Sequence, residues 1–172
     1  MLKKAKAEKH LIVEVGFLRE ISELPELKKN PVLDELGIPM TYIPSRNTIF
    51  FSIASYFSEI IGAKYIVTGH CIIDPFPDCK PKYVKAINTA LFSGSRLGKE
   101  YRTKIVMPFT KMDKTAILKP ALELGVPLEL TWSCHGDGKI ACSRCSGCIR
   151  RLKAFEDLDL EDKIMYQLIS KS

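Results

Sequence analysis

Residues 47–68 read NTIFFSIASYFSEIIGAKYIVT, and this stretch decides the fold class. Its first part places apolar residues at helical spacing as far as Gly62, which predicts a helix over 47–61. Its last five residues, 64–68, form a short, mainly apolar run with two β-branched residues in the middle, which is typical of a buried strand. A helix that leads directly into a buried strand is the repeating unit of α/β proteins.

The same alternation extends along the chain in both directions. Further strands are predicted at 10–15, 104–107 and 128–132, further helices at 82–91 and 114–124, and two helices after the cysteine-rich stretch. Residues 20–45 contain four prolines and Gly37, which indicates a loop. We therefore expect a parallel sheet with flanking helices over residues 1–132, and a cysteine loop with C-terminal helices packed on it over 133–172.

Composition and charge restrict the class of partner. The chain has 172 residues, a net charge of +6 and a calculated pI of about 9.0. This charge permits binding to nucleic acid, but it suits small anions equally, and we do not expect nucleic acid as the main direct partner. No apolar run approaches the roughly 18 residues that cross a bilayer, and no secretory signal is evident. We expect a cytoplasmic protein without a membrane partner.

Four of the six cysteines lie close together, at Cys134, Cys142, Cys145 and Cys148. Zinc favours four thiolates in a tetrahedron, each about 2.3 Å from the metal. The two-residue gaps allow neighbouring thiolates to converge on one ion, and the longer gap contains Gly136 and Gly138 for tight turning. The spacing therefore predicts one structural zinc ion per chain, with no coordination position left open for chemistry.

Other interpretations of the cysteines remain open. An iron–sulfur cluster or disulfides would also use closely spaced cysteines, although disulfides conflict with a cytoplasmic location. Nearby cations could offset the charge of the thiolates or form only a basic surface: Lys139, Arg144, Arg150 and Arg151. Of the two remaining cysteines, Cys71 is expected to be a small buried residue, and Cys79 lies in a proline-restricted loop where either role is open.

Polar residues that follow the predicted strands form a candidate ligand site, because ligands gather beyond the C-terminal ends of parallel strands. Asp74 and Asp78 lie in the loop after the strand at 64–68, where either could be a simple turn residue. Arg46 and Asn47 open the helix over 47–61, whose free N–H groups favour an anion. As an alternative, Ser45 or Asn47 is only a helix cap.

Two further residues complete the candidate site. Lys114 starts the helix that follows the strand at 104–107, where it could meet a phosphate or be an ordinary surface lysine. Trp132 lies just before the cysteine loop and could stack on a planar ligand or belong to the core.

Several short motifs occur in one order along the chain. They are IPSRN at 43–47, FPDCKP at 76–81, Lys114 with Ile117, GVP at 125–127, TWSC at 131–134, the cysteine cluster and Arg151. Over residues 10–155 this order resembles the 7-cyano-7-deazaguanine synthase family. The resemblance implies a Rossmann-like sheet of the adenine nucleotide α-hydrolase type with a zinc site.

The resemblance also implies an activity. Members convert 7-carboxy-7-deazaguanine and ammonia to the 7-cyano base in an ATP-dependent ligase reaction, on the route to queuosine or archaeosine in tRNA. It implies a deazaguanine substrate at Arg46, Asn47, Asp74, Asp78, Lys114 and Trp132, and it assigns no catalytic residue.

One motif of the family has no counterpart in these 172 residues, namely the phosphate-binding loop Ser-Gly-Gly-x-Asp-Ser. We therefore expect the first strands of the sheet to be missing, and ATP with Mg²⁺ to bind only if a separate chain or segment supplies that loop. The uncovered sheet edge would favour a homodimer or hetero-oligomer. Two alternatives are an inactive zinc-containing module that binds deazaguanine or RNA, and a tRNA-thiolating relative, which would need a reactive Cys71 or Cys79.

Overall fold

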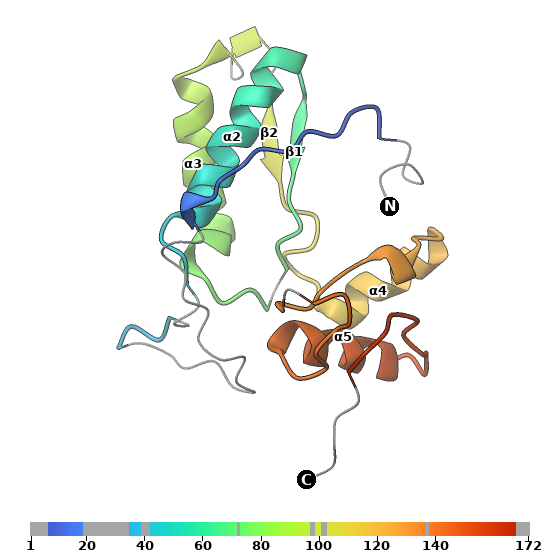
Figure 1. Ribbon diagram of the computed structural model, residues 1–172. Coiled ribbons are helices and arrows are strands. Elements are labelled where there is room, and N and C mark those ends of the chain that lie inside the picture. Colours follow the sequence, from blue (N-terminus) through green and yellow to red (C-terminus); the bar gives the residue numbers. More distant parts are fainter. Residues whose placement is uncertain are drawn as a thin grey trace. The chain divides into compact units, whose positions relative to one another are not determined.

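A computed structural model of the protein describes residues 7–18, 35–38, 42–71, 73–96, 99–100, 103–136 and 138–167. Contacts divide the chain into two compact units. The first unit is Leu33–Asp113, and the second combines Met1–Val32 with Lys114–Ser172. The helices and strands of both units are labelled in Figure 1.

The unit Leu33–Asp113 contains a parallel two-stranded sheet with helices beside it (Figure 1). Strands β1 (Tyr65–Val67) and β2 (Lys104–Val106) pair in parallel with Ile66 opposite Ile105. The helices of this unit are α2 (Arg46–Ile61), η1 (Pro77–Cys79, a 3-10 helix) and α3 (Pro81–Ser93). These elements confirm the helices and strands predicted between residues 47 and 107, and with them the α/β class.

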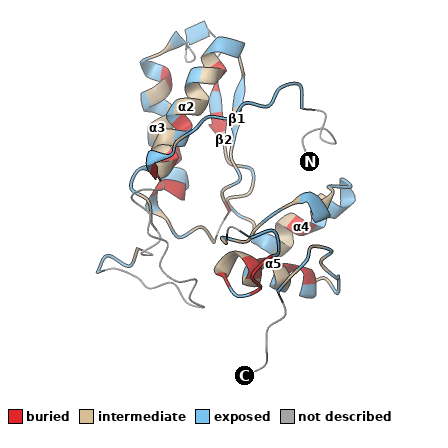
Figure 2. Ribbon diagram, viewed as in Figure 1, coloured by how far each residue is buried: buried red, intermediate tan, exposed pale blue. Residues whose placement is uncertain are grey.

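Local sequence signals explain where these helices begin and end. Helix α2 stops at Gly62, which adopts the left-handed conformation with φ 66° that favours glycine. Helix α3 starts with Pro81, whose missing N–H costs nothing in the first turn. The core of the unit lies between the helices and the sheet and consists of Phe51, Val84, Phe92 and Ile105, with Ile66 and Leu91 packed against them. Figure 2, coloured by burial, shows buried segments in α2 and α3.

The second unit is built around two helices, α4 (Lys114–Glu123) and α5 (Ser146–Glu156). Leu118 of α4 packs against Ala154 and Phe155 of α5 in a small core. Helix α4 therefore belongs with the cysteine loop, whereas the sequence-based division at residue 132 groups it with the sheet. Among the described helices, none is long and apolar enough to span a membrane.

Three of the predicted elements differ in the structure. Residues 10–15 form no strand, because no described segment pairs with them, and Ile12 is 81% exposed. The strand predicted at 128–132 is instead a short 3-10 helix, η3 (Leu128–Leu130), whose carbonyl groups bind a buried arginine described below. Of the two expected C-terminal helices, only α5 lies within the described residues, and 157–167 form turns and a single β-bridge.

Candidate metal centre and ligand-binding loops

The four clustered cysteines converge in the structure as their spacing predicts. The Sγ atoms of Cys134, Cys142, Cys145 and Cys148 all lie within 4.8 Å of one another. The Sγ atoms of Cys142 and Cys148 are 4.0 Å apart. Four thiolates about 2.3 Å from one ion would be about 3.8 Å from each other, so a tetrahedral metal ion fits with only small adjustments. These four residues can therefore hold a metal ion such as zinc.

Backbone N–H groups point at the cysteine sulfurs. Cys134 Sγ accepts from the N–H groups of Gly136 and Cys142, both at 3.3 Å, and Cys142 Sγ accepts from Cys145 N–H at 3.4 Å. Burial raises the pKa of Cys142, but hydrogen bonds outweigh it and bring the pKa down to about 6. These bonds come from the N–H groups of Arg144 and Cys145 and from the side chains of Cys134 and Cys145. Burial and hydrogen bonds with Cys145 and Cys134 raise the pKa of Cys148. The backbone of the loop thus stabilises a thiolate, which is the form that binds metal.

Helix α5 begins inside the cluster. Cys145 is its N-cap and accepts a hydrogen bond from the N–H of Cys148, so the positive end of the helix faces the sulfurs. A side chain at Gly147 would overlap the carbonyl oxygen of Ser133 and lie 3.1 Å from His135 Nε2. Glycine at this position therefore allows the segment that carries Cys134 to approach the first turn of the helix.

The C-terminal segment attaches to the cysteine loop through its backbone. Ala141 forms a parallel bridge with Tyr166. The N–H of Ala141 donates to the carbonyl oxygen of Met165 at 2.9 Å, and its carbonyl oxygen accepts from the N–H of Gln167 at 2.8 Å. Ser143, in the left-handed conformation with φ 58°, donates from its Oγ to the carbonyl oxygen of Gln167 at 3.0 Å. These contacts hold the loop that carries Cys142 and Cys145 in place.

Arg151 is a buried cation of this unit. In the sequence it is identifiable as a basic residue near the cysteines and as part of the motif order, without its partners. Its guanidinium donates to Asp162 Oδ1 at 2.9 Å, to Leu128 O at 2.9 Å and to Thr131 Oγ1 at 2.6 Å. Further bonds to Asp162 Oδ2 and Thr131 O engage its remaining donors. Burial raises the pKa of Asp162, but its bonds to Arg151 and Tyr166 lower the pKa further than burial raises it. Arg151 therefore joins η3, α5 and residue 162 rather than neutralising a metal site.

In the other unit, the loop after β1 meets the start of α2. The backbone N–H of Asn47 donates to Asp78 Oδ2 at 3.1 Å, and Asn47 Nδ2 donates to Cys79 Sγ at 3.3 Å. All three residues are buried. Burial, followed by the charges of Asp78 and Asp74, raises the pKa of Cys79 to about 11. Cys79 is thus a neutral thiol at physiological pH and a poor nucleophile.

Arg46 and Asp74 flank this contact. The guanidinium of Arg46 lies over the ring of Phe76, 5.4 Å from its centroid, and Tyr42 packs on the same ring. Asp74 Oδ2 accepts from the N–H of Cys71 at 2.7 Å, which makes Asp74 a turn residue as well as a candidate ligand group. Four of the predicted site residues, Arg46, Asn47, Asp74 and Asp78, therefore lie where the loop after β1 meets the start of α2.

The other two predicted residues lie in the second unit. Lys114 is the exposed first residue of α4, and Trp132 is 47% exposed. A common site formed by Lys114, Trp132 and the β1 loop stays a prediction.

Comparison with known proteins decides the family. The model of the family "Queuosine biosynthesis protein QueC" matches residues 1–159. The chain belongs to the QueC family.

Relatives in this family carry the name 7-cyano-7-deazaguanine synthase. The chain is 39% identical to the protein from Nostoc punctiforme, over 95% of this chain and 78% of that protein. It is 40% identical to the protein from Thermoplasma acidophilum, over 84% of this chain and 61% of that protein. The protein from Campylobacter hominis is 38% identical, over 90% of this chain and 73% of that protein. The resemblance seen in the motifs is confirmed, and the chain is a 7-cyano-7-deazaguanine synthase-like protein that spans about three fifths to four fifths of these relatives.

One residue at the end of β1 in this QueC family member was missed by the sequence analysis. His70 Nδ1 lies 3.0 Å from Thr68 Oγ1, and the His70 ring packs edge-on against Phe51. Burial lowers the pKa of His70, although the charges of Asp74 and Asp78 partly oppose this shift. Its position two residues after the predicted strand was the signal that could have found it.

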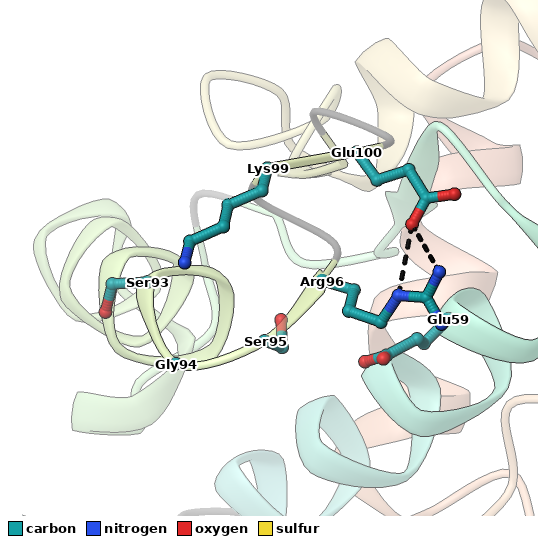
Figure 3. Close-up of a pocket in the computed structure, with 7 residues that line it drawn as sticks. All are labelled: Glu59, Ser93, Gly94, Ser95, Arg96, Lys99 and Glu100. Carbon is teal, nitrogen blue, oxygen red and sulfur yellow. Dashed lines mark hydrogen bonds and ion pairs between the residues drawn. The ribbon is translucent and has the colours of Figure 1, made fainter.

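A hollow of about 610 Å³ lies elsewhere in the same unit, beside the ends of α2 and α3 (Figure 3). It is lined by Glu59, Ser93, Gly94, Ser95, Arg96, Lys99 and Glu100. Arg96 donates to Glu100 at 2.8 Å, and the lining carries equal numbers of acidic and basic side chains. The hollow shares no residue with the motifs that carry the family resemblance.

Proposed function

We propose that this chain supplies the zinc-bearing and substrate-binding portion of a 7-cyano-7-deazaguanine synthase. In that reaction 7-carboxy-7-deazaguanine and ammonia give the 7-cyano base at the expense of ATP, and the product serves tRNA modification. The observation that carries the proposal is the identity of 38–40% to synthases over 84–95% of the chain. The four convergent cysteines are consistent with it.

The metal in this proposal is zinc with a structural role. Four cysteine ligands suit zinc and fill a tetrahedral shell, so substrate has no position at the metal. Cys145 caps α5, and Cys134 lies two residues beyond Trp132. A zinc ion here would fix the start of α5 and the segment that carries Trp132.

For the substrate, the residues at the β1 loop supply complementary chemistry. Arg46 offers a planar fork of donors for a carboxylate, and its position over Phe76 leaves it half-buried. The carboxylate of Asp74 is an acceptor of the kind that a guanine-like N–H edge requires. Lys114 and Trp132 are proposed to add a phosphate contact and a stacking surface.

The nucleotide site requires a further contribution. The 172 residues contain no Ser-Gly-Gly-x-Asp-Ser, and backbone N–H groups of such a loop are what cradle phosphates. We propose that Mg²⁺ and ATP bind when a separate chain or segment supplies this loop. The uncovered sheet edge favours a homodimer or hetero-oligomer. For the 172 residues alone we expect an ATP dissociation constant of about 1 mM or weaker, near −4 kcal/mol.

The test compares two proteins, the 172-residue chain and a fusion that adds a strand and a Ser-Gly-Gly-x-Asp-Ser loop. Each is incubated with ATP, ammonia and 7-carboxy-7-deazaguanine, and the nitrile is detected by mass spectrometry. We expect nitrile from the fusion and none from the chain alone. The matched control is the fusion with the loop serines and aspartate replaced by alanine.

Failure of the fusion to form nitrile, with the deazaguanine acid still bound in calorimetry, would favour the inactive binding module instead. Micromolar ATP binding by the chain alone would contradict the proposed need for a second segment.

A further inference from the structure

Helix α2 starts without a side-chain cap from its N-terminal neighbour. Its N-cap residue, Ser45, has φ 54° and ψ 18°, and its side chain makes no capping hydrogen bond. A serine that caps a helix normally has an extended backbone, which directs its oxygen at the N–H groups of the first turn. In the left-handed conformation of Ser45 this geometry is lost. The N–H of Arg46 donates to the carbonyl oxygen of Ile43 at 3.2 Å, and the N–H of Asn47 has an acceptor from a distant part of the chain.

Asp78 supplies that acceptor from 31 residues further along the chain. Its Oδ2 accepts from the N–H of Asn47 at 3.1 Å, in the first turn of α2. The side chain is buried, with only 5% of the residue exposed, and a carboxylate at the positive end of a helix is favourable. Asp78 therefore acts as the N-terminal cap of α2, the role that its position in the sequence would give to Ser45.

Two further hydrogen bonds link Asn47 and Asp78 to Cys79, so that each of the three residues is bonded to the other two. Asn47 Nδ2 donates to Cys79 Sγ at 3.3 Å, and the Cys79 thiol donates to Asp78 Oδ1 at 3.8 Å. We call Asn47, Asp78 and Cys79 the latch. Both oxygens of the Asp78 carboxylate are thus engaged within the protein.

The latch joins the two segments that form the Arg46 stacking contact. Arg46 directly precedes Asn47, and Phe76, over which its guanidinium lies, is two residues before Asp78. We propose that Asp78 is a positioning residue, which caps α2 and thereby holds Arg46 over Phe76. The capping role is independent of the proposed function, and only the naming of Arg46 as a substrate residue rests on it.

Amide hydrogen exchange of the 172-residue chain tests the cap without any ligand. In Asp78→Ala, exchange of the Asn47 amide should be at least tenfold faster than in the unchanged protein. In the matched control Ser45→Ala, which alters the nominal cap, it should be unchanged. Asp78→Asn, which retains an acceptor oxygen and conserves shape, should lie between them and provides the comparison if Asp78→Ala does not fold. Equal Asn47 exchange in all four proteins would overturn the proposal.

The NMR shifts of the Arg46 side chain give a second test, because a general loss of stability would not change them in the folded protein. The Phe76 ring should shift the NMR signals of the Arg46 side chain upfield, and this shift should disappear in Asp78→Asn or Asp78→Ala below their unfolding transitions. Retention of the shift in both variants would contradict positioning.

In the fusion that carries the phosphate loop, the affinity for 7-carboxy-7-deazaguanine separates positioning from direct contact. If Asp78 acts through Arg46, Asp78→Asn should weaken binding about tenfold in the unchanged background but less than twofold when Arg46 is already alanine. A tenfold loss in both backgrounds would show a direct contact. If the unchanged fusion does not bind the acid, the proposed function fails, while the exchange and NMR results still decide the cap.

Discussion

Cys142 in one unit and Cys79 in the other are both buried, and their surroundings shift the thiol pKa in opposite directions. At Cys142, hydrogen bonds to the sulfur outweigh burial and bring the pKa down to about 6. At Cys79, burial and the nearby carboxylates of Asp78 and Asp74 raise it to about 11. The first environment favours a thiolate ligand, and the second favours a neutral thiol that only donates and accepts hydrogen bonds.

The cysteine loop is therefore suited to bind a metal, whereas the loop after β1 uses its polar side chains to hold the start of α2. In the cysteine loop, the side chains singled out by their spacing are those that converge. In the loop after β1, Asp78 was singled out as a ligand group, and its carboxylate is engaged with Asn47 and Cys79. The predictions below test this contrast, from the largest expected effect on stability to the smallest.

Loss of the metal should have the largest effect. Cys142→Ser removes one of four thiolates, and we expect zinc to fall from about one per chain to near zero, with a loss of several kcal/mol in the free energy of unfolding. Elemental analysis and denaturant unfolding measure the two quantities. The control Cys71→Ala, outside the cluster, should keep its zinc. Iron in place of zinc in the unchanged protein would contradict the assignment.

The buried arginine should come next. Arg151→Met leaves Asp162 buried without its cation, and breaking such a pair costs about 3–5 kcal/mol. Arg150→Met, on the exposed neighbouring residue, should change stability little. Because the pKa of Asp162 is lowered in the folded state, its contribution is present above the ordinary aspartate pKa and is lost as the pH falls through the folded pKa. Urea unfolding at neutral and acidic pH should therefore show the difference between the two proteins shrinking in acid.

These contacts explain how far sequence could predict the structure. The helices and strands between residues 47 and 107 follow from local periodicity and from Gly62 and Pro81, so they could be predicted. The segment at 128–132 resembles a strand in composition, but the carbonyls of Leu128 and Thr131 bind Arg151, which lies 20 or more residues away. Local pattern has no information about such a partner.

The candidate sites show the same limit. Cysteine spacing restricts the geometry so strongly that the cluster could be predicted from composition and gaps alone. The cap of α2 could not, because Ser45 has the right residue type and the wrong backbone conformation, and Asp78 reaches the helix only through the fold. The importance of Gly147 was also hidden, since it depends on the position of the Ser133 carbonyl.

A change at Gly147 tests the packing around the metal rather than the metal ligands. Gly147→Ala introduces a methyl group that overlaps the Ser133 carbonyl oxygen, and overpacking of this kind costs about 1–3 kcal/mol. We expect weaker zinc retention against a chelator although all four cysteines remain. Gly138→Ala is the matched control, because a methyl group there would be 3.5 Å from the Ile140 carbonyl oxygen, an ordinary contact. Equal zinc retention in both variants would show that the helix start is free to shift.

The smallest effect on stability, and the most direct test of the contrast, concerns the Cys79 thiol. Its pKa is raised from 9.0 to about 11, so at pH 8 only about one thousandth of it is thiolate, and alkylation by iodoacetamide should be slow. Because the folded pKa is the higher one, this group stabilises the fold below pH 9, and that contribution is lost as the pH rises through about 11. Asp78→Asn removes the charge next to Cys79 and should speed the alkylation of Cys79. Mass spectrometry measures the alkylation, with Cys79→Ser as the blank. Glu161→Gln, which removes a negative charge elsewhere on the chain, is the control and should leave the rate unchanged. Alkylation of Cys79 at the rate of a free cysteine in the unchanged protein would mean that the latch is open in solution, and the contrast between the two loops would not hold.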